Sequence, residues 1–347
     1  MLDMSQTPTQ QLRDFPGPDR FGCGMIAEPL IAVEVCAGAG GQAIGLEAAG
    51  FDHAALVEID EDCRRTLKLN RPHWNIADAA QSDICAFDGR PFRGVDLLSG
   101  GLPCPPFSVA GKQLGEADER NLFPAFLRLV DEIRPRAIMV ENVRGFLDPR
   151  FAPFRNGLQL DFQRLGYRIQ WRLLQAADFG VPQLRPRVVI VGMRDDLPGT
   201  FKWPAPLTAP PPSVGQVLED LMAAGGWVGA SDWATQAGGV APTLVGGSRK
   251  HGGPDLGPTR ARRAWAAMGV DGRSVVQDPP GNDHVGMPRL TVRMTARLQG
   301  FPDTWQISGR RTAAYRQVGN AFPPPVARAV AEQIAVVLRC SAISAVA

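Results

Sequence analysis

The chain lacks several features that define whole classes of protein. Its six cysteines, at positions 23, 36, 63, 85, 104 and 340, include no C-x-x-C pair, and no cysteine–histidine group has zinc-site spacing. No apolar run reaches the ~18 residues that a membrane span requires. The N-terminal region has no basic start followed by an apolar stretch. We therefore expect a reduced cytoplasmic protein with no metal site and no membrane contact.

A strong excess of either charge is also missing. Lys and Arg number 37 and Asp and Glu 35, so the formal net charge is +2. Such a small charge does not indicate a polyanionic partner, and any argument for nucleic acid must rest on local clusters. The length of 347 residues, with 44% hydrophobic and 21% charged residues, is typical of a soluble globular enzyme with more than one domain.

Short apolar runs alternate with amphipathic stretches, which predicts an α/β fold. We expect strands near 31–35, 54–57, 95–98, 137–140 and 188–191. Apolar residues at helical spacing between 121 and 133 predict a helix that covers one face of the sheet. The alternation ends where prolines gather between 198 and 212, and we place a domain boundary there.

A glycine turn follows the first expected strand. Residues 37–43 match G-x-G-x-x-A and precede a helical pattern, and Glu58 ends the second expected strand. Glycines allow the backbone to approach a ligand closely, and an acid at this place can accept ribose hydroxyls. Nicotinamide, flavin and S-adenosylmethionine enzymes share the pattern, and a plain strand–helix turn needs the same glycines. The pattern alone therefore leaves the cofactor open.

Cys104 occurs in a stiff segment directly after the strand expected at 95–98. The prolines at 105 and 106 push the residues before them out of the α region, so the thiol is presented from an extended turn. A cysteine can also be a small buried hydrophobe. Glu141 ends the strand expected at 137–140, and a one-helix crossover places both residues on one rim of a parallel sheet. A thiolate beside a carboxylic acid suits addition to an electron-poor ring.

Two arginines stand on alternate positions just before the strand expected at 188–191. Arg185 and Arg187 would face the same side of an extended chain and could favour a nearby thiolate. The alternative is a surface charge or a salt bridge to a structural acid.

These motifs together resemble the DNA (cytosine-5)-methyltransferase family, in the family's order from Ile31 to Ile334. They are the glycine turn 37–41, Glu58, Asp83-Ile84, Pro103-Cys104, Glu141-Asn142-Val143, Gln183/Arg185/Arg187, Arg297–Pro302 and Gln317–Asn320. The resemblance implies an α/β fold with a Rossmann-like mixed sheet and helices on both faces, plus a smaller irregular target-recognition domain. It divides the chain into an N-terminal extension 1–29, a catalytic and cofactor-binding domain 30–197, a target-recognition domain and hinge 198–311, and a C-terminal return 312–347.

The resemblance also implies the reaction. Cys104 attacks carbon 6 of a cytosine flipped out of duplex DNA, and carbon 5 takes a methyl group from S-adenosylmethionine. The catalytic residues implied are Cys104, Glu141, Arg185 and Arg187. The cofactor-binding residues implied are Cys36, Gly38, Gly41, Glu58, Asp83, Ile84, Pro103, Leu122, Asn320 and Ala321.

The chain departs from the family pattern at two places. Glu34-Val35-Cys36 replaces the usual Asp-Leu-Phe, so an aromatic face for the adenine is missing. Met294 replaces a common glutamate, which weakens a domain-joining contact at most.

A basic, glycine-rich segment between 244 and 265 is the predicted DNA surface. Its cations suit phosphates or guanine edges. The alternative for Arg260, Arg262 and Arg263 is a solvated helix face beside Trp265. The resemblance also implies that residues 111–121 form a catalytic loop, which carries Lys112. The predicted DNA-binding residues are Lys112, Arg249, Lys250, Arg260, Arg262 and Arg263.

Three other functions use parts of the same pattern. A transfer-RNA cytosine-5 methyltransferase would share every catalytic residue. A catalytically inactive DNA-binding relative is disfavoured because the catalytic set is intact, and a dehydrogenase would leave Cys104 and Glu141 without roles. We expect a monomer that acts on duplex DNA, with a separately encoded restriction endonuclease as the partner that the resemblance suggests.

Overall fold

The computed structural model describes residues 28–103, 121–248 and 253–344, the last four by their backbone alone. Cys104, Lys112, Arg249 and Lys250 lie outside these residues. The described chain forms two compact units. Unit 1 holds Gln175–Arg185 and Pro206–Pro325, and unit 2 holds the described residues up to Leu174, Pro186–Ala205 and the chain from Val326 onward.

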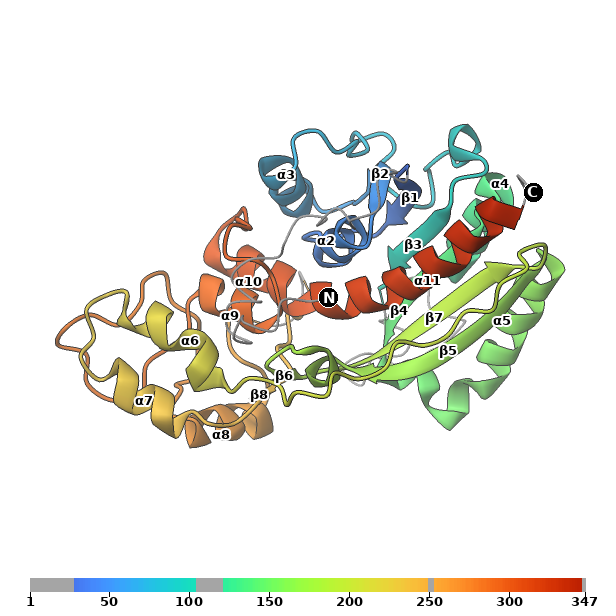
Figure 1. Cartoon of the computed structure of the whole chain (residues 1–347). Helices are drawn as coiled ribbons and strands as arrows, with labels where there is room; N and C mark the ends of the chain where they lie inside the picture. Colours follow the sequence, from blue (N-terminus) through green and yellow to red (C-terminus); the bar gives the residue numbers. More distant parts are fainter. Residues whose placement is uncertain (1–27, 104–120, 249–252, 345–347) are drawn as a thin grey trace. The chain divides into compact units, whose positions relative to one another are not determined.

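Unit 2 is built on a six-stranded sheet with the order β2-β1-β3-β4-β7-β5 (Figure 1). The strands are β1 (Leu30–Val35), β2 (Phe51–Val57), β3 (Leu97–Gly101), β4 (Ala137–Val143), β5 (Tyr167–Gln175) and β7 (Pro186–Arg194). β1 pairs in parallel with β2 and β3, and β3 with β4, whereas β7 runs antiparallel to β4. The mixed α/β sheet expected from the sequence is therefore confirmed.

Helices separate the parallel strands because such strands need a crossover. Unit 2 contains α2 (Gly41–Ala48), α3 (Glu61–Asn70), α4 (Phe123–Ile133), α5 (Ala152–Arg164) and the short 3-10 helices η1 (Arg90–Phe92), η3 (Arg144–Leu147) and η4 (Pro149–Phe151). α3 begins at an N-cap, since the Asp60 carboxylate accepts from the Asp62 and Cys63 amides.

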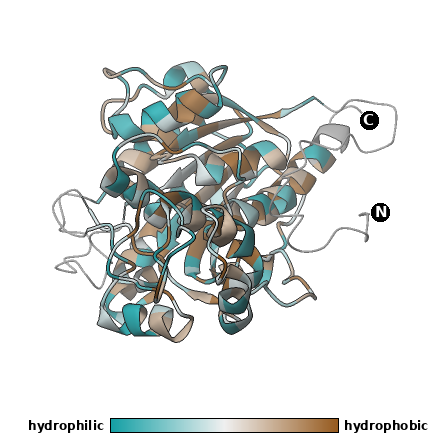
Figure 2. Ribbon diagram, turned by 90° about the vertical axis from the view of Figure 1, so that its left-hand side faces the viewer, coloured by the Kyte–Doolittle hydropathy of each residue, from teal (hydrophilic) through white to brown (hydrophobic). Residues whose placement is uncertain are grey.

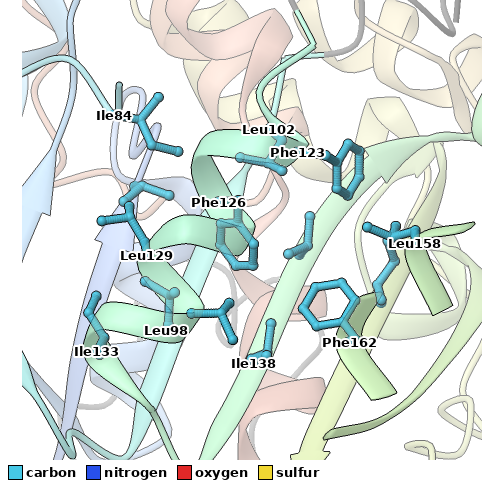
Figure 3. Close-up of a cluster of buried hydrophobic side chains, with 14 of the residues drawn as sticks. Ile84, Leu98, Leu102, Phe123, Phe126, Leu129, Ile133, Ile138, Leu158 and Phe162 are labelled. Carbon is cyan, nitrogen blue, oxygen red and sulfur yellow. The ribbon is translucent and has the colours of Figure 1, made fainter. Parts of the chain in front are cut away.

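The main core of unit 2 lies between the sheet and helices α4 and α5. Figure 3 shows Phe126 and Leu129 of α4 near Leu98 of β3 and Ile138 of β4. All four side chains are fully buried. Burying a side chain of this size stabilises the fold by about 1.5–3 kcal/mol. The packing of α4 therefore holds β3 and β4 together, the two strands whose carboxyl ends form the predicted catalytic rim.

The long helix α11 (Pro324–Ser344) continues from unit 1 into unit 2. Within unit 2, Arg136 at the start of β4 donates to the Leu338 carbonyl at 2.7 Å. Among the helices that the structure describes, none is long and apolar enough to cross a membrane.

Unit 1 is mainly helical and has its own core. It contains α6 (Val214–Ala223), α7 (Ala230–Gln236), α8 (Thr259–Ala267), α9 (Val292–Leu298), α10 (Arg311–Asn320), the 3-10 helix η5 (Ala176–Phe179) and the two short parallel strands β6 (Gln183–Leu184) and β8 (Ala241–Pro242). Trp233, Trp265 and Tyr315 are buried in this core. Figure 2 shows hydrophilic and hydrophobic stretches alternating along the helices, as packing on one face requires.

Met294, the departure from the family glutamate, caps α9 inside unit 1. The Thr291 hydroxyl accepts from the Met294 amide at 3.2 Å, and the Met294 sulfur accepts from the Thr291 amide at 3.3 Å. This is a capping box in which a thioether replaces the usual carboxylate or amide. Met294 is also buried in the unit 1 core, so it acts in local helix capping and packing.

Candidate active site

Glu141 and Arg187 form a buried ion pair at the end of β4 where the chain leaves the sheet. The Arg187 Nε lies 2.7 Å from Glu141 Oε1, and the two side chains are 12% and 10% exposed. The antiparallel pairing of β4 with β7 brings them together, since Val143 is opposite Arg187 and Glu141 opposite Val189. The carboxylate is therefore fixed, and a positive charge lies beside it.

The two glycines that end β3 differ in the space around them, and Gly101 is the one that faces this pair. Gly101 is opposite Glu141 in the parallel register. A Cβ at Gly101 would stand 3.6 Å from Glu141 Oε2 and from the Cys36 carbonyl. A Cβ at Gly100 would clash with Val35 of β1, whereas the distances at Gly101 are ordinary van der Waals contacts, so only Gly101 has room for a Cβ. Cys104 follows three residues after Gly101 in sequence, outside the described residues.

Glu58 is tied to the glycine turn. Its carboxylate accepts from the Gly38 amide at 2.7 Å and from the Asp60 amide at 2.7 Å. Burial raises the pKa of Glu58, and the two amide donors oppose that effect. A carboxylate has about four acceptor positions, so these bonds leave room for ribose hydroxyls. Gly38 has φ 56°, and a Cβ built there meets no atom within 4 Å.

Three further predicted cofactor residues lie around this turn. Burial raises the pKa of the Cys36 thiol, and the neighbouring carboxylates of Glu58 and Asp83 raise it further. The thiol therefore stays neutral at physiological pH. Asp83 accepts from the Cys85 amide at 2.9 Å and shapes a short turn, while Ile84 is buried in the core.

The remaining predicted cofactor residues of unit 2 flank the segment 104–120. Pro103 is exposed directly after β3, and Leu122 packs half-buried against the core just before α4. Gly41 is buried at the first position of α2.

Arg128 of α4 is a positioning residue that the sequence analysis missed. Its Nη2 donates to the carbonyls of Ile84 at 2.9 Å and Phe87 at 3.1 Å, and its Nη1 pairs with Glu132. The sequence predicts this helix only as a cover for one face of the sheet. The i,i+4 spacing of Arg128 and Glu132 was the available signal, although it does not reveal that the guanidinium holds the Asp83–Phe87 turn.

Arg185 is a buried residue that binds backbone carbonyls of unit 1. Its side chain is fully buried and donates to the carbonyls of Leu244 at 2.7 Å, Gly319 at 2.8 Å and Ala321 at 3.0 Å, all in unit 1. Arg187, in contrast, pairs with Glu141 in unit 2. The two arginines have different partners because the chain passes from unit 1 to unit 2 between Arg185 and Pro186. The catalytic role of Arg185 therefore stays a prediction, while its described hydrogen bonds position backbone carbonyls of unit 1.

Asn320 and Ala321 belong to the backbone assembly that Arg185 organises. The Ala321 carbonyl also accepts from the Gln299 amide, and Gln299 in turn accepts from Gln183 at 2.7 Å. Asn320 donates to the Gly247 carbonyl at 3.1 Å. A Cβ at Gly319 would lie 2.6 Å from the Gly246 Cα, so the two backbones touch. Three of the sequence motifs thus meet in one buried network of unit 1.

The predicted DNA-binding arginines that the structure describes lie on α8. Arg260, Arg262 and Arg263 are exposed, while Trp265 of the same helix is fully buried. Within the described residues, none of the three makes an ion pair. This geometry fits both interpretations of the sequence, a DNA-binding surface and a solvated helix face.

The described residues contain no cluster of three or more side chains able to hold a metal ion. The polar groups gathered here are the ones that a nucleotide-like cofactor needs: a buried acid beside a glycine turn, a neutral thiol and an ordered turn at Asp83. They fit S-adenosylmethionine by the chemistry of their donors and acceptors.

Comparisons with known proteins show which family the chain resembles. A model of the C-5 cytosine-specific DNA methylase family matches residues 31–336. The chain is 52% identical to Type II methyltransferase M.NgoMIV of Neisseria gonorrhoeae over 306 residues, which cover 87% of this chain and 96% of that protein. It is also 52% identical to Type II methyltransferase M.NaeI of Lentzea aerocolonigenes over 310 residues, covering 88% and 75%.

A solved structure shares the fold. A putative DNA modification methyltransferase encoded within a prophage of E. coli superposes with a TM-score of 0.64 at 23% identity, covering 89% of this chain and 99% of that one. The matched span and the identity to curated relatives show that the chain belongs to the family of C-5 cytosine-specific DNA methylases and is a DNA methyltransferase.

Proposed function

We propose that this enzyme methylates carbon 5 of a flipped-out cytosine within a short, specific sequence of duplex DNA, through a covalent bond to Cys104. The observation that carries the proposal is the buried Glu141–Arg187 pair at the end of β4, opposite the glycine from which the chain leads to Cys104. Extruding a base costs a few kcal/mol, which contacts in the pocket must offset.

The proposed chemistry uses three side chains. The Cys104 thiolate adds to carbon 6, forming a carbon–sulfur bond and making carbon 5 nucleophilic. Glu141 hydrogen-bonds the ring nitrogen and the exocyclic amine as charge develops, and Arg187 contacts the base oxygen and fixes Glu141. After carbon 5 has gained the methyl group, it loses its proton, the carbon–sulfur bond breaks and the thiolate is restored.

S-adenosylmethionine, when bound, supplies an electrophilic methyl group. In this proposal Glu58 accepts the ribose hydroxyls, the open space at Gly38 admits the ligand, and Cys36 and Ile84 border the adenine. Gly41, Asp83, Pro103, Leu122, Asn320 and Ala321 complete the proposed set. No aromatic ring stands at position 36, so we expect weaker stacking there.

The cations of α8 are proposed to bind phosphates, together with Lys112, Arg249 and Lys250. Because the relatives named above are Type II methyltransferases, we further propose that the enzyme protects DNA in a restriction-modification system, with a separately encoded endonuclease as its counterpart.

A trapping experiment tests the covalent step. Duplex DNA that contains 5-fluorocytosine cannot release fluorine in place of the proton, so the adduct should persist. We expect a denaturation-resistant complex with the wild type in the presence of S-adenosylmethionine and none with Cys104→Ala. Transfer RNA with the same analogue serves as the comparison substrate. Absence of the complex on every duplex sequence, or its formation on transfer RNA alone, would overturn the proposal.

A further inference from the structure

Asp271 of unit 1 holds two arginines, Arg273 and Arg289, at the edge of a surface cavity of about 620 Å³. Neither arginine was among the residues that the sequence indicated for DNA contact. We propose that this pair reads guanine in the target sequence by donating to its O6 and N7 atoms. The inference rests on the proposed function, since it names the residues and the base class that give that activity its specificity.

The aspartate orients both guanidinium groups. Asp271 Oδ1 accepts from Arg273 Nε at 2.9 Å, and Oδ2 accepts from Arg273 Nη2 at 2.9 Å and from Arg289 Nε at 2.8 Å. The Arg273 amide also donates to Oδ1 at 3.1 Å. The hydrogen bonds from Arg273 and then from Arg289 hold the pKa of Asp271 well below its usual range. The carboxylate therefore stays charged.

These bonds leave donors available. Arg273 uses Nε and Nη2, so its outer Nη1–Nη2 edge is open, and its side chain is 74% exposed. Arg289 uses only Nε among the described residues, and its side chain is 40% exposed. A guanidinium fork presented in this way matches the two acceptors of guanine in the major groove.

The backbone around the pair is rigid. The Asp271 amide donates to the Pro288 carbonyl at 2.9 Å, and the Val276 amide donates to the Leu290 carbonyl at 2.9 Å. The neighbouring side chains of Val270, Val275 and Leu290 are fully buried in the unit 1 core. The two stretches that carry the arginines are therefore locked side by side, and little conformational entropy is lost when a base binds.

The carboxylate favours base reading over phosphate binding. Phosphate contacts need positive charge and little geometry, and a buried aspartate lowers the local positive charge. Arg260, Arg262 and Arg263 on α8 have no carboxylate partner among the described residues, as phosphate contacts would require. Asp271 reduces the net positive charge but fixes the direction of the guanidinium groups, which is useful where a donor must meet two particular acceptors on a base.

The first test uses the unmodified protein and a chemically altered DNA. Bisulfite sequencing of a duplex library methylated by the wild type defines the guanines that the enzyme requires. Each required guanine is then replaced by 7-deazaguanine, which lacks the N7 acceptor. We expect kcat/KM to fall by about 5- to 150-fold at one or two of them, the range for a bidentate contact. Insensitivity at every guanine would overturn the inference.

Charge-conserving variants link that effect to the two residues. Arg273→Lys and Arg289→Lys keep the charge but lose the fork, so each should lower kcat/KM on the preferred sequence and remove the 7-deazaguanine effect at one position. Arg262→Lys on α8 is the matched control and should leave base preference unchanged.

The outcomes separate this inference from the proposed function. If the lysine variants lose activity equally on all sequences, the pair contacts phosphate, the inference fails and the methyltransferase proposal stands. If the wild type yields no methylated cytosine in any duplex, the proposed function itself fails.

Discussion

Arg185 and Arg187 are separated by one residue, yet the first bonds to carbonyls of unit 1 and the second pairs with a carboxylate of unit 2. The chain between them crosses from one compact unit to the other. Substitutions of these two arginines should therefore change different properties of the enzyme, so experiments can separate their roles.

Glu141→Gln should abolish most methyl transfer while the protein remains able to bind cofactor. The substitution keeps the shape of the side chain but leaves the Arg187 charge buried without its partner. We expect methyl transfer to fall by about 10²- to 10⁴-fold and the free energy of unfolding by about 3–5 kcal/mol. Activity assays and urea unfolding measure the two effects.

The control is Glu61→Gln in the exposed pair with Arg65, whose side chains are 68% and 56% exposed. That change should alter stability by no more than about 1 kcal/mol. A Glu141→Gln enzyme with wild-type turnover would contradict the role proposed for the carboxylate.

Arg185→Met should act on stability and cofactor affinity. The change removes the donors to three buried carbonyls, and each unsatisfied acceptor costs about 1–3 kcal/mol, so the free energy of unfolding should fall by about 3 kcal/mol or more. Because Asn320 and Ala321 are proposed cofactor residues, KM for S-adenosylmethionine should rise more than kcat falls. Arg185→Lys should restore part of both. A fall in kcat alone, with KM and stability unchanged, would instead indicate contact with the substrate.

The sequence predicts the main strands well because they are continuous buried runs. The strands expected at 31–35, 137–140 and 188–191 lie within β1, β4 and β7, and the helix expected at 121–133 is α4. β5 was not predicted. It lies at the edge of the sheet and carries exposed residues such as Arg168 and Arg172, so it lacks the apolar run that marks the other strands.

Long-range contacts account for most of what sequence reasoning missed. Gln183 reaches Gln299 across 116 residues of chain, and no local pattern assigns Gln175–Arg185 to unit 1. The ion pairs of Asp271 span only 2 and 18 residues. Aspartates close to arginines in sequence are common on protein surfaces, however. Asp271 differs from them because it is buried, which the sequence does not show.

Gly319→Ala should disturb the contact between the end of α10 and the loop at Gly246. The new methyl group would lie 2.6 Å from the Gly246 Cα, and the backbone at Gly319 is held because its carbonyl accepts from Arg185. Overpacking of this kind costs about 1–3 kcal/mol. Gly157→Ala on α5 is the matched control, because a Cβ there meets nothing within 4 Å and should stabilise the helix by about 0.4–1 kcal/mol. Melting temperatures that move in the same direction for both variants would contradict the close approach.

His53 should make the fold sensitive to acid. Its Nε2 lies 3.1 Å from the Ala43 carbonyl, and its Nδ1 is buried without a partner among the described residues. Burial lowers the pKa of His53 to about 4, against about 6.5 in the unfolded chain. The folded state thus favours the neutral ring, so the contribution is complete above pH 6.5 and is lost as the pH falls towards 4. By pH 5 the loss amounts to about 2 kcal/mol.

The measurement is urea unfolding between pH 7.5 and 4.5. His53→Gln cannot titrate, so its stability should fall less steeply over this range than that of the wild type, whatever the cost of the substitution at neutral pH. His73→Gln changes an exposed histidine and should keep the wild-type slope. Parallel slopes for wild type and His53→Gln would mean that water reaches the ring in the folded protein, because only a solvated imidazole could take up the proton at no cost to the fold.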